Sequence, residues 1–384
     1  MTPADLSRTV LHAVRRAVDE DALRAPVPAR VRVERTRPGG SGDYACAVAL
    51  QLAGPAALPA LEVARILRER VAAEPGVGRV EITGPGFLSF TLDAPAAGDR
   101  AVLDAVRQQG LAYGHGDALR DEIHQYHHAR EVRAAVTAQA VFRLLVAQGA
   151  RGRITCEQAP DPDWVRLGVT VNAYGTPPVP LTEIRPVPAG ATAGELLERL
   201  GPDAARWGLL RPAGHDRAAL GPELLVQGEA NPLFRVRYAH ARARALTRGA
   251  ALLGFTAEPA PYAEDPAEPT PYGESPAPHA PYGESPAEGS APYGGAARPL
   301  LDLVADHPGV LLAAARHRAP DRVARQLEAV AHAFFDFHDS CPPLPVGDEK
   351  PSAAHRARLA LAEAAGTVLA GGLSLLGIRA PEHL

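Results

Sequence analysis

The spacing of hydrophobic and polar residues predicts two helices and two strands in residues 1–110. Apolar residues recur every three to four positions from Ala4 to Val18 and from Leu58 to Ala72, which is typical of amphipathic helices. The predicted apolar face of the second helix consists of Leu61, Val63, Ile66, Leu67 and Val71. Tyr44–Leu52 and Gly78–Leu92 are strand-like, and Gly84-Pro85-Gly86 breaks the second stretch as a turn does. We therefore expect residues 1–110 to form an N-terminal α+β domain.

Residues 111–202 combine helical and strand patterns over a short length. A helix is predicted at Val132–Gln148, with short strands around Ile154 and Val169 and a Pro-rich stretch at Pro177–Pro188. This segment is too short for a complete nucleotide-binding sheet. We interpret it as a truncated α/β domain.

Residues 203–384 have a helical pattern almost throughout. Helices are predicted at Asp203–Leu210, Pro222–Leu253, Leu300–Asp306, Val310–Ala315, Asp321–Asp339 and Ser352–Leu376. Gly377 and the Ala380-Pro381 pair supply the signals that end the last helix. The C-terminal part is therefore predicted to be an all-α bundle.

A tandem repeat interrupts this bundle at residues 256–297. Its units, such as PYGESPAPHA and PYGESPAEGSA, are rich in Pro, Gly, Ala, Ser and Glu. The large apolar groups of the repeat are Tyr262, Tyr272, Tyr282 and Tyr293. Such a composition buries too little surface to offset the entropy of ordering, so we predict a disordered insert. A tyrosine-spaced motif that binds a partner is the alternative.

The charge of the chain is concentrated in this insert. The whole chain has a net charge of −4, but residues 256–297 hold seven acidic residues and neither Lys nor Arg. The remainder therefore carries a net charge of +3, and nearly all of its cations are arginines. Lys350 is the only lysine. A mildly basic, Arg-rich surface is compatible with a nucleic-acid partner.

Other composition features exclude several classes of protein. Cys46, Cys156 and Cys341 lie far apart and form no CxxC pair, which argues against a zinc knuckle or a disulfide framework. No run approaches the roughly 20 apolar residues of a membrane helix. The first residues are amphipathic and charged, without the apolar region of a signal peptide. We expect a cytoplasmic protein that does not contact a membrane.

The N-terminal domain resembles the additional domain of bacterial arginyl-tRNA synthetases. The matching residues are Gly42-Asp43-Tyr44 followed by AVALQL, and later Gly84-Pro85-Gly86-Phe87-Leu88. The resemblance implies contact with the elbow of tRNA, with Tyr44 and Phe87 as candidate binding residues. This chain has Ala47 where the family usually has an asparagine that reads the elbow. Recognition here would then depend on shape and charge.

The C-terminal bundle resembles the anticodon-binding domain of the same family, which is named for its DALR tetrad. That tetrad corresponds to Asp203-Ala204-Ala205-Arg206, and Asn231–Arg242 matches the family's NPxxxVQYAHAR helix. The C-terminal LSLLGIRAPEHL corresponds to LxLLGIxxPERM. The resemblance implies tRNA binding, arginine-accepting tRNA above all. The candidate tRNA-binding residues are Asn231, Arg235, Tyr238, Arg242 and Arg244.

The predicted helix that contains these arginines has two interpretations. Arg235 and Arg242 share one stripe, whereas Arg237, Arg244 and Arg248 share another. The stripes form either an ordinary solvated basic surface or a wall that contacts phosphates, with Tyr238 free to stack on an unpaired base. The resemblance favours the second interpretation.

The central segment departs from the family's catalytic signatures. HxGHLR aligns with His128–Arg133, so that Arg130 replaces glycine and Glu131 replaces the second histidine. An arginine side chain should block the place of the adenine, and a carboxylate would repel the charge that develops on phosphate. The KMSKS-like signature aligns with Thr182–Pro186, which contains no lysine. Residues 111–202 would then be a degenerate remnant of a class I catalytic domain, and His128, Arg130 and Glu131 relics of its signature.

These departures predict a pseudoenzyme, a paralogue that binds tRNA without catalysis and needs no cofactor. One alternative is an arginine–tRNA ligase that binds ATP. Another is a protein-interaction subunit of a complete aminoacyl-tRNA synthetase or of a metabolic enzyme. Because synthetases of this family are monomeric, the resemblance implies a monomer. We expect no metal, because the helical spacing of His124, His127 and His128 is not completed by a nearby carboxylate or cysteine pair.

Overall fold

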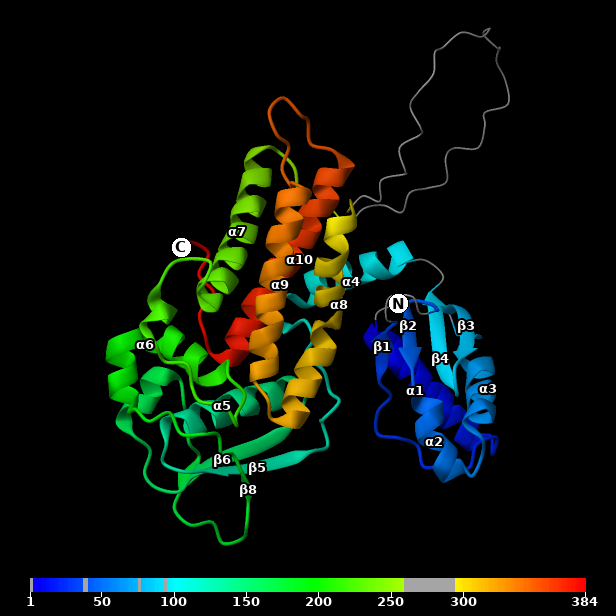
Figure 1. Cartoon of the computed structure of the whole chain (residues 1–384), viewed down its shortest axis with the longest axis horizontal. Coiled ribbons are helices and arrows are strands. Elements are labelled where there is room, and N and C mark those ends of the chain that lie inside the picture. The colour runs from blue at the N-terminus through cyan, green and yellow to red at the C-terminus, as the bar shows by residue number, and fades with distance from the viewer. Residues whose placement is uncertain (1–2, 37–40, 75–76, 93–94, 259–293) are drawn as a thin grey trace. The chain divides into compact units, whose positions relative to one another are not determined.

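The computed structural model describes residues 3–36, 41–74, 77–92, 95–258 and 294–384. The chain divides into two compact units, Met1–Asp104 and Ala105–Leu384, and each unit has its own fold (Figure 1). The second unit includes the segments predicted as 111–202 and 203–384. The three-part division of the chain therefore stays a prediction.

The first unit packs helices on one antiparallel sheet. Its helices are α1 (Pro3–Asp19), α2 (Val48–Ala56) and α3 (Ala60–Val71). Its strands are β1 (Val33–Arg35), β2 (Tyr44–Cys46), β3 (Val77–Thr83) and β4 (Phe87–Leu92), in the order β1-β2-β4-β3. The helix α4 (Pro95–Gln109) then leads into the second unit. The α+β class predicted for this part is confirmed.

Two details of the first unit differ from the prediction. The predicted strand Tyr44–Leu52 ends at Cys46, because Val48, Ala49 and Leu52 are buried at helical spacing in α2. Its Ala and Leu residues are strong helix formers. On α3, Val63, Leu67 and Val71 are buried, whereas Leu61 is 45% exposed because it lies on the opposite side of the helix.

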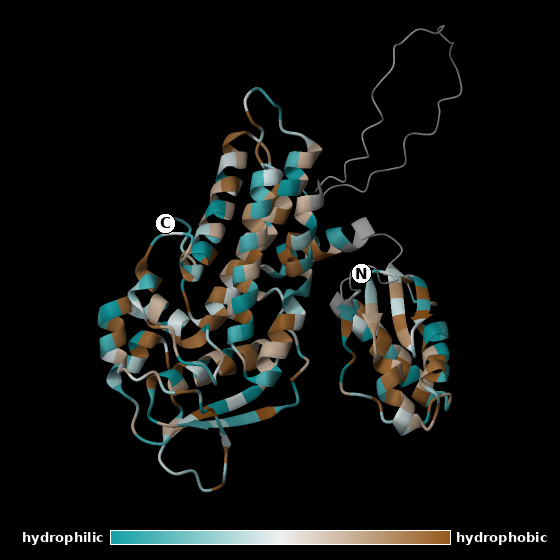
Figure 2. Ribbon diagram, in the orientation of Figure 1, coloured by the Kyte–Doolittle hydropathy of each residue, from teal (hydrophilic) through white to brown (hydrophobic). Residues whose placement is uncertain are grey.

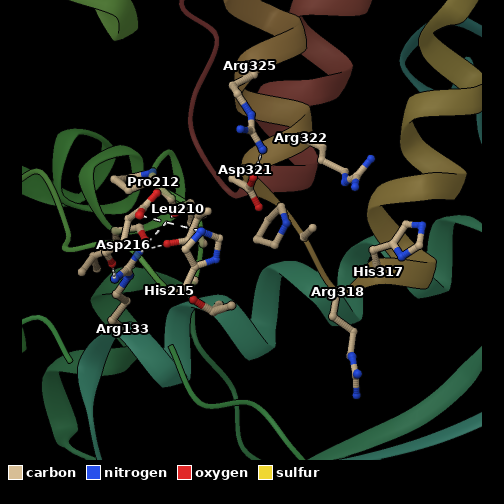
Figure 3. Close-up of a pocket in the computed structure, with 16 residues that line it drawn as sticks. Arg133, Leu210, Pro212, His215, Asp216, His317, Arg318, Asp321, Arg322 and Arg325 are labelled. Atoms are coloured by element: carbon tan, nitrogen blue, oxygen red, sulfur yellow. Dashed lines mark hydrogen bonds and ion pairs between the residues drawn. The ribbon is translucent and has the colours of Figure 1, made fainter. Parts of the chain in front are cut away.

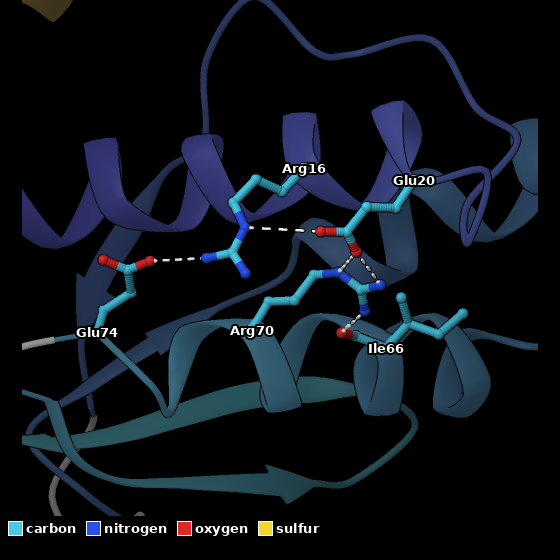
Figure 4. A network of polar contacts seen from close by, with 5 residues as sticks. All are labelled: Arg16, Glu20, Ile66, Arg70 and Glu74. Atoms are coloured by element: carbon cyan, nitrogen blue, oxygen red, sulfur yellow. Dashed lines mark hydrogen bonds and ion pairs between the residues drawn. The ribbon is translucent and has the colours of Figure 1, made fainter.

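An ionic network joins α1 to α3 (Figure 4). Arg70 donates to Glu20 through Nε at 3.0 Å and Nη2 at 2.6 Å, and to the carbonyl oxygen of Ile66 at 2.8 Å. Arg16 donates to Glu74 at 3.2 Å. The partners are partly exposed, so the network orients the two helices more than it stabilises them.

The second unit begins with a small parallel sheet. Its strands are β5 (Ile123–His128), β6 (Arg151–Cys156), β7 (Ala173–Tyr174) and β8 (Thr182–Glu183), in the order β7-β6-β5-β8. The helix α5 (Val132–Ala147) connects β5 to β6 and is buried over most of its length. The predicted helix Val132–Gln148 and the predicted strand around Ile154 are confirmed.

The sheet corrects two sequence-based predictions. The three histidines lie on the strand β5 and not on a helix, so His128 faces the opposite side from His127. Val169 is not in a strand, because Asp161 caps a 3-10 turn at Pro162–Leu167 and Gly168 follows with φ 64°. In the part of the chain that the structure describes, no group of three or more His, Cys, Asp or Glu residues could hold a metal ion.

Five of the described helices form the bundle of the second unit. They are α6 (Ala193–Leu210), α7 (Pro232–Leu252), α8 (Gly294–His317), α9 (Asp321–Ser340) and α10 (Ala353–Leu376). Each carries both hydrophobic and hydrophilic residues (Figure 2). Of the described helices, α10 alone is long and apolar enough to span a membrane, but 83% of that stretch is buried. It is the central core helix of the bundle.

Helix ends in the bundle differ from the prediction where caps decide them. α7 begins at Pro232 and not at Pro222, because Asn231 caps it. α6 begins at Ala193, with a capping box at Thr192 and a kink at Gly201. α8 continues through Pro308, although the sequence predicts a break there. Proline removes the N–H that would bond to the carbonyl oxygen of Val304, and Tyr113 Oη donates to that oxygen instead, at 3.2 Å.

The predicted disordered insert 256–297 falls mostly on residues 259–293, which lie outside the described residues. Its two ends are described and belong to the bundle. Ala257 is buried, and α8 already begins at Gly294.

Candidate nucleic-acid interface

Asn231 is buried at the start of α7 and holds the chain that leads into the helix. Its Oδ1 accepts hydrogen bonds from the backbone N–H groups of Leu233 and Phe234, at 3.0 and 3.4 Å. Its Nδ2 donates to the carbonyl oxygens of Leu224 and Val226, at 2.8 and 2.9 Å. All its polar atoms are thus used within the chain, so Asn231 orients α7 and does not face a ligand.

Three aromatic rings line the seam between α7 and α9, and we call Phe234, Tyr238 and Phe335 the aromatic platform. Tyr238 lies 5.7 Å from Phe234 and 5.5 Å from Phe335, with ring planes tilted by 8° and 22°. Tyr238 is 43% exposed. Stacked rings with an exposed member offer an unpaired base a further stacking position.

Two predicted arginines flank this platform and are oriented by histidines of α9. Arg235 Nη2 donates to His332 Nδ1 at 3.0 Å, and Arg242 Nε donates to His338 Nε2 at 3.3 Å. His338 also contacts Asp339, at 3.1 Å. Neither arginine forms an ion pair with a carboxylate among the described residues, so none of these carboxylates competes with an anionic ligand for the guanidinium groups.

The second arginine stripe of α7 faces α6 and the C-terminal segment instead. Arg237 approaches Asp203 at 3.8 Å, and Arg244 pairs with Glu382 at 3.1 Å. Arg248 donates to His383 at 3.4 Å. The predicted residue Arg244 is therefore separated from Arg235, Tyr238 and Arg242, which the structure brings together on the other side of the helix.

The Asp203–Arg206 tetrad connects α6 to the end of α10. Asp203 accepts hydrogen bonds from the backbone N–H and Nε of Arg379, at 3.3 and 3.0 Å. Arg206 is buried and donates to the carbonyl oxygens of Leu376, at 2.8 Å, and Leu167. Burial lowers the pKa of Arg206 to about 9, and the nearby Arg143 acts in the same direction. Asp203 and Arg206 therefore hold α6 against the end of α10 and are not available to a ligand.

The residues aligned with the class I signature lie where β5 ends and α5 begins. His128 is buried, and its Nδ1 is 2.8 Å from the carbonyl oxygen of Ala129. Burial lowers the pKa of His128. Arg130 Nε donates to the carbonyl oxygen of Ala159 at 2.8 Å. Glu131 caps α5 by accepting from the backbone N–H of Ala134 at 2.8 Å, and it also accepts from that of Ala189 at 2.9 Å.

Arg133, the last residue of this segment, is an interior cation that carbonyl groups surround. It donates to the carbonyl oxygens of Leu209, Val187, Pro212, Ala213 and Asp216. Burial lowers the pKa of Arg133, although Glu131 and Asp216 oppose this effect. The side chain joins α5 to the segment that follows α6, so its role is structural.

The two candidates of the first unit differ in exposure. Tyr44 is 5% exposed and belongs to the core of this unit, whereas Phe87 is 38% exposed at the start of β4. The Gly84-Pro85-Gly86 turn precedes Phe87, and Gly86 has φ 135° with the backbone of Ala60 close by. Phe87 can therefore meet a ligand without any rearrangement, and Tyr44 cannot.

Sequence reasoning missed the contribution of α9 to this interface. His332, Phe335 and His338 of α9 complete the platform with Phe234 of α7 and orient its arginines. The run Phe334-Phe335-Asp336-Phe337-His338 carried a signal. Three aromatic residues in four positions cannot all face one core side of a helix, so one of them must be partly exposed.

Comparisons with known proteins agree with the resemblance at both ends of the chain. Residues 5–92 match the arginyl-tRNA synthetase N-terminal domain, and residues 288–384 match the DALR anticodon-binding domain. An arginine–tRNA ligase of Frankia alni is 26% identical, with all of both chains covered. A second, from Renibacterium salmoninarum, is 35% identical over 54% of this chain and 38% of its own length.

Solved structures show the same fold. Thermus thermophilus arginyl-tRNA synthetase matches with a TM-score of 0.64 at 15% identity, covering all of both chains. Plasmodium falciparum arginyl-tRNA synthetase matches with a TM-score of 0.61 at 8% identity, covering 100% of this chain and 99% of its own. These identities are low, so the likeness concerns the fold.

The comparisons correct one sequence-based prediction. We expected a protein that is not an enzyme, from Arg130, Glu131 and the missing lysines. That prediction is wrong, because relatives that align over the full chain are named arginine–tRNA ligase and the matching structures are arginyl-tRNA synthetases, which points to an enzyme. With matched domains at both ends and relatives along its whole length, the chain belongs to the arginyl-tRNA synthetase family.

Proposed function

We propose that this protein binds arginine-accepting tRNA through the aromatic platform and its two flanking arginines, in the service of arginyl-tRNA aminoacylation. The observation that carries the proposal is the arrangement of Arg235, Tyr238 and Arg242 around one exposed stack of rings. Stacking would hold an unpaired base, and the guanidinium groups would donate hydrogen bonds to the edge of that base and to the phosphates beside it. The cytoplasmic location expected from the sequence fits this function.

The choice of base depends on groups beside the stack. A ring stacks on any base, so stacking supplies affinity and little selectivity. Selectivity has to come from hydrogen-bond donors at the edge of the platform, and Arg235 and Arg242 supply them. We therefore expect binding to respond to the identity of the bases that reach the platform.

Filter binding tests this proposal with transcripts that differ only in the anticodon loop. The wild-type protein is expected to prefer an arginine-accepting transcript over the same molecule with its anticodon bases replaced. Equal affinity for both transcripts would contradict base recognition at the platform. Absence of binding to either one would contradict the proposal altogether.

The reaction named for the relatives, ligation of arginine to tRNA, is the second candidate. The alignment with the Frankia alni ligase runs over 579 positions, whereas this chain has 384 residues. We infer that the sheet β5–β8 corresponds to a shortened catalytic domain. In support of a site there, His128 lies at the carboxyl end of β5, where α/β sheets bind their ligands, and its buried Nε2 has no hydrogen-bond partner among the described residues.

Aminoacylation with labelled arginine tests this second candidate. The wild-type protein should charge an arginine-accepting transcript in the presence of ATP, and His128→Ala should reduce the rate. Absence of charging by a preparation that binds the same transcript would contradict ligation while leaving tRNA binding intact.

A further inference from the structure

The turn between α8 and α9 holds an arginine in a backbone conformation that favours glycine. Arg318 has φ 53°, and it follows His317, the last residue of α8. Its N–H donates to the carbonyl oxygen of Ala315 at 3.2 Å, and that of Ala319 donates to Ala314 at 3.0 Å. This left-handed position at a helix end is usually glycine, since a Cβ there costs about 1 kcal/mol. An arginine held in this costly conformation motivates the hypothesis that its charge has a function.

The surroundings of this turn are basic and exposed. His317, Arg318 and Arg322 all have exposed side chains, and no carboxylate lies within ion-pair distance of Arg318 or Arg322 in the described part of the chain. Arg325 instead forms an ion pair with Asp321. The arrangement therefore leaves two guanidinium groups at this corner of the unit that no described carboxylate pairs with.

The turn also borders a pocket of about 470 Å³ (Figure 3). The opposite wall contains Arg133, which the backbone carbonyl groups already hold, and His215 and Asp216. The side chains of Arg318 and Arg322 also line the pocket, and both point away from Arg133 (Figure 3). Because both side chains are exposed, they are available to a ligand that lies on the surface.

The helix α9 connects this corner to the aromatic platform. Arg322, Arg325, His332 and Asp336 follow one another at spacings of three, seven and four residues, so they lie on one outer stripe of α9. Phe335 is thirteen residues from Arg322, which corresponds to about 20 Å along the helix axis. A single RNA molecule that contacts the platform can therefore extend along the stripe and reach the corner.

We propose that Arg318 and Arg322 form a second tRNA-contact surface, the α8–α9 corner, which binds backbone phosphates of the tRNA held at the platform. The inference rests on the proposed function. Guanidinium groups that no described carboxylate pairs with suit phosphate oxygens. Contact with phosphates alone makes this surface independent of sequence, so it strengthens binding of every tRNA equally.

Salt-dependent filter binding of Arg318→Gly and Arg322→Gln, alone and together, tests the corner. Each loss of a phosphate contact should reduce the magnitude of the slope of log K against log salt by about 1, with the preference among tRNAs unchanged.

Arg318→Gly should also raise Tm, because glycine removes the strain at φ 53°. Higher stability combined with weaker binding separates a binding role from a structural one. Arg166→Gln, an exposed arginine paired with Asp163, is the matched control and should change neither quantity.

If the double variant still binds tRNA and its slope of log K against log salt is unchanged, phosphate binding at the α8–α9 corner would be contradicted. The proposed function would not be affected. Loss of preference between tRNAs in the double variant would also contradict phosphate binding at the corner, because phosphate contacts carry no sequence information. A wild-type protein that binds no tRNA would overturn both proposals. A slope reduced by about 2, with preference retained, is the expected result.

Discussion

The rings of Tyr238 on α7 and Phe335 on α9 stack with their centroids 5.5 Å apart. This contact joins two helices that are about 100 residues apart in the sequence, and it leaves Tyr238 on the surface. A tyrosine held by two rings loses little conformational freedom when a base stacks on it. The contact therefore makes the platform a preformed binding surface.

Removing the exposed ring should weaken tRNA binding. Tyr238→Ala is expected to cost about 1–3 kcal/mol, or roughly fivefold to 150-fold in Kd, because one stacked base loses its partner. Tyr238→Phe keeps the ring and should bind within about twofold of the wild type. Filter binding against an arginine-accepting transcript measures both. Equal losses in the two variants would show that the hydroxyl group, and not the ring, makes the contact.

Asn231 should affect stability rather than recognition. Asn231→Ala removes the cap of α7 and leaves the carbonyl oxygens of Leu224 and Val226 without their donor, at a cost of about 1–3 kcal/mol. Urea unfolding measures this loss. At temperatures where the variant is folded, its affinity for tRNA should match that of the wild type. A selective loss of affinity would instead indicate direct contact with tRNA.

Gly377 should resist substitution far more than another glycine of the bundle. A Cβ there would lie 2.6 Å from Arg206 Cζ and 1.9 Å from Arg143 Nη1, and φ is 73°. Gly377→Ala is therefore expected to destabilise the protein by about 2–4 kcal/mol. Gly309, within α8, has no atom near its Cβ position, so Gly309→Ala should stabilise by up to about 1 kcal/mol. Thermal unfolding compares the two, and similar Tm values would contradict the close packing at Gly377.

Stability should fall with acid because of a buried histidine. Burial lowers the pKa of His307 to about 4, although a hydrogen bond with Gln326 opposes the shift. Between pH 6.5 and 4 the unfolded chain binds a proton that the folded protein does not, so His307 contributes a loss of up to about 3 kcal/mol as pH falls through this window.

Urea unfolding at pH 7.5 and pH 4.5 measures this effect. His307→Gln lacks the titrating group and should lose less stability over the same interval. His128 and His240 have pKa values lowered by burial too, and they contribute equally to both proteins. An identical acid-induced loss in the variant would contradict the assignment to His307.

Much of the fold follows from local patterns in the sequence. The helices α1, α5, α9 and α10 appear where apolar spacing predicts them, and the turn at Gly84-Pro85-Gly86 joins β3 to β4. The failures occur where a distant residue decides the outcome. α8 continues through Pro308 because Tyr113 satisfies the carbonyl group of Val304, which no local pattern shows. β5 was missed because its three histidines suggested a helical face.

The sequence predicted some residues of the candidate site and missed others, again because distant residues meet only in the folded chain. Arg235, Tyr238 and Arg242 were predicted because the segment that contains them resembles the NPxxxVQYAHAR helix of the family. Their partners His332, Phe335 and His338 lie on another helix, so only the packing of α7 against α9 brings them together. Asn231 and Arg244 have the expected residue types, but a cap and an ion pair already occupy them.

The most direct test of the account is filter binding of wild-type protein and Arg235→Ala/Arg242→Ala to total tRNA and to an arginine-accepting transcript, at low and at physiological salt. The account predicts that the wild type prefers the arginine-accepting transcript, that salt weakens its binding steeply, and that the double variant loses the preference. Weak and equal binding of every RNA, unaffected by the two substitutions, would contradict tRNA recognition at the aromatic platform.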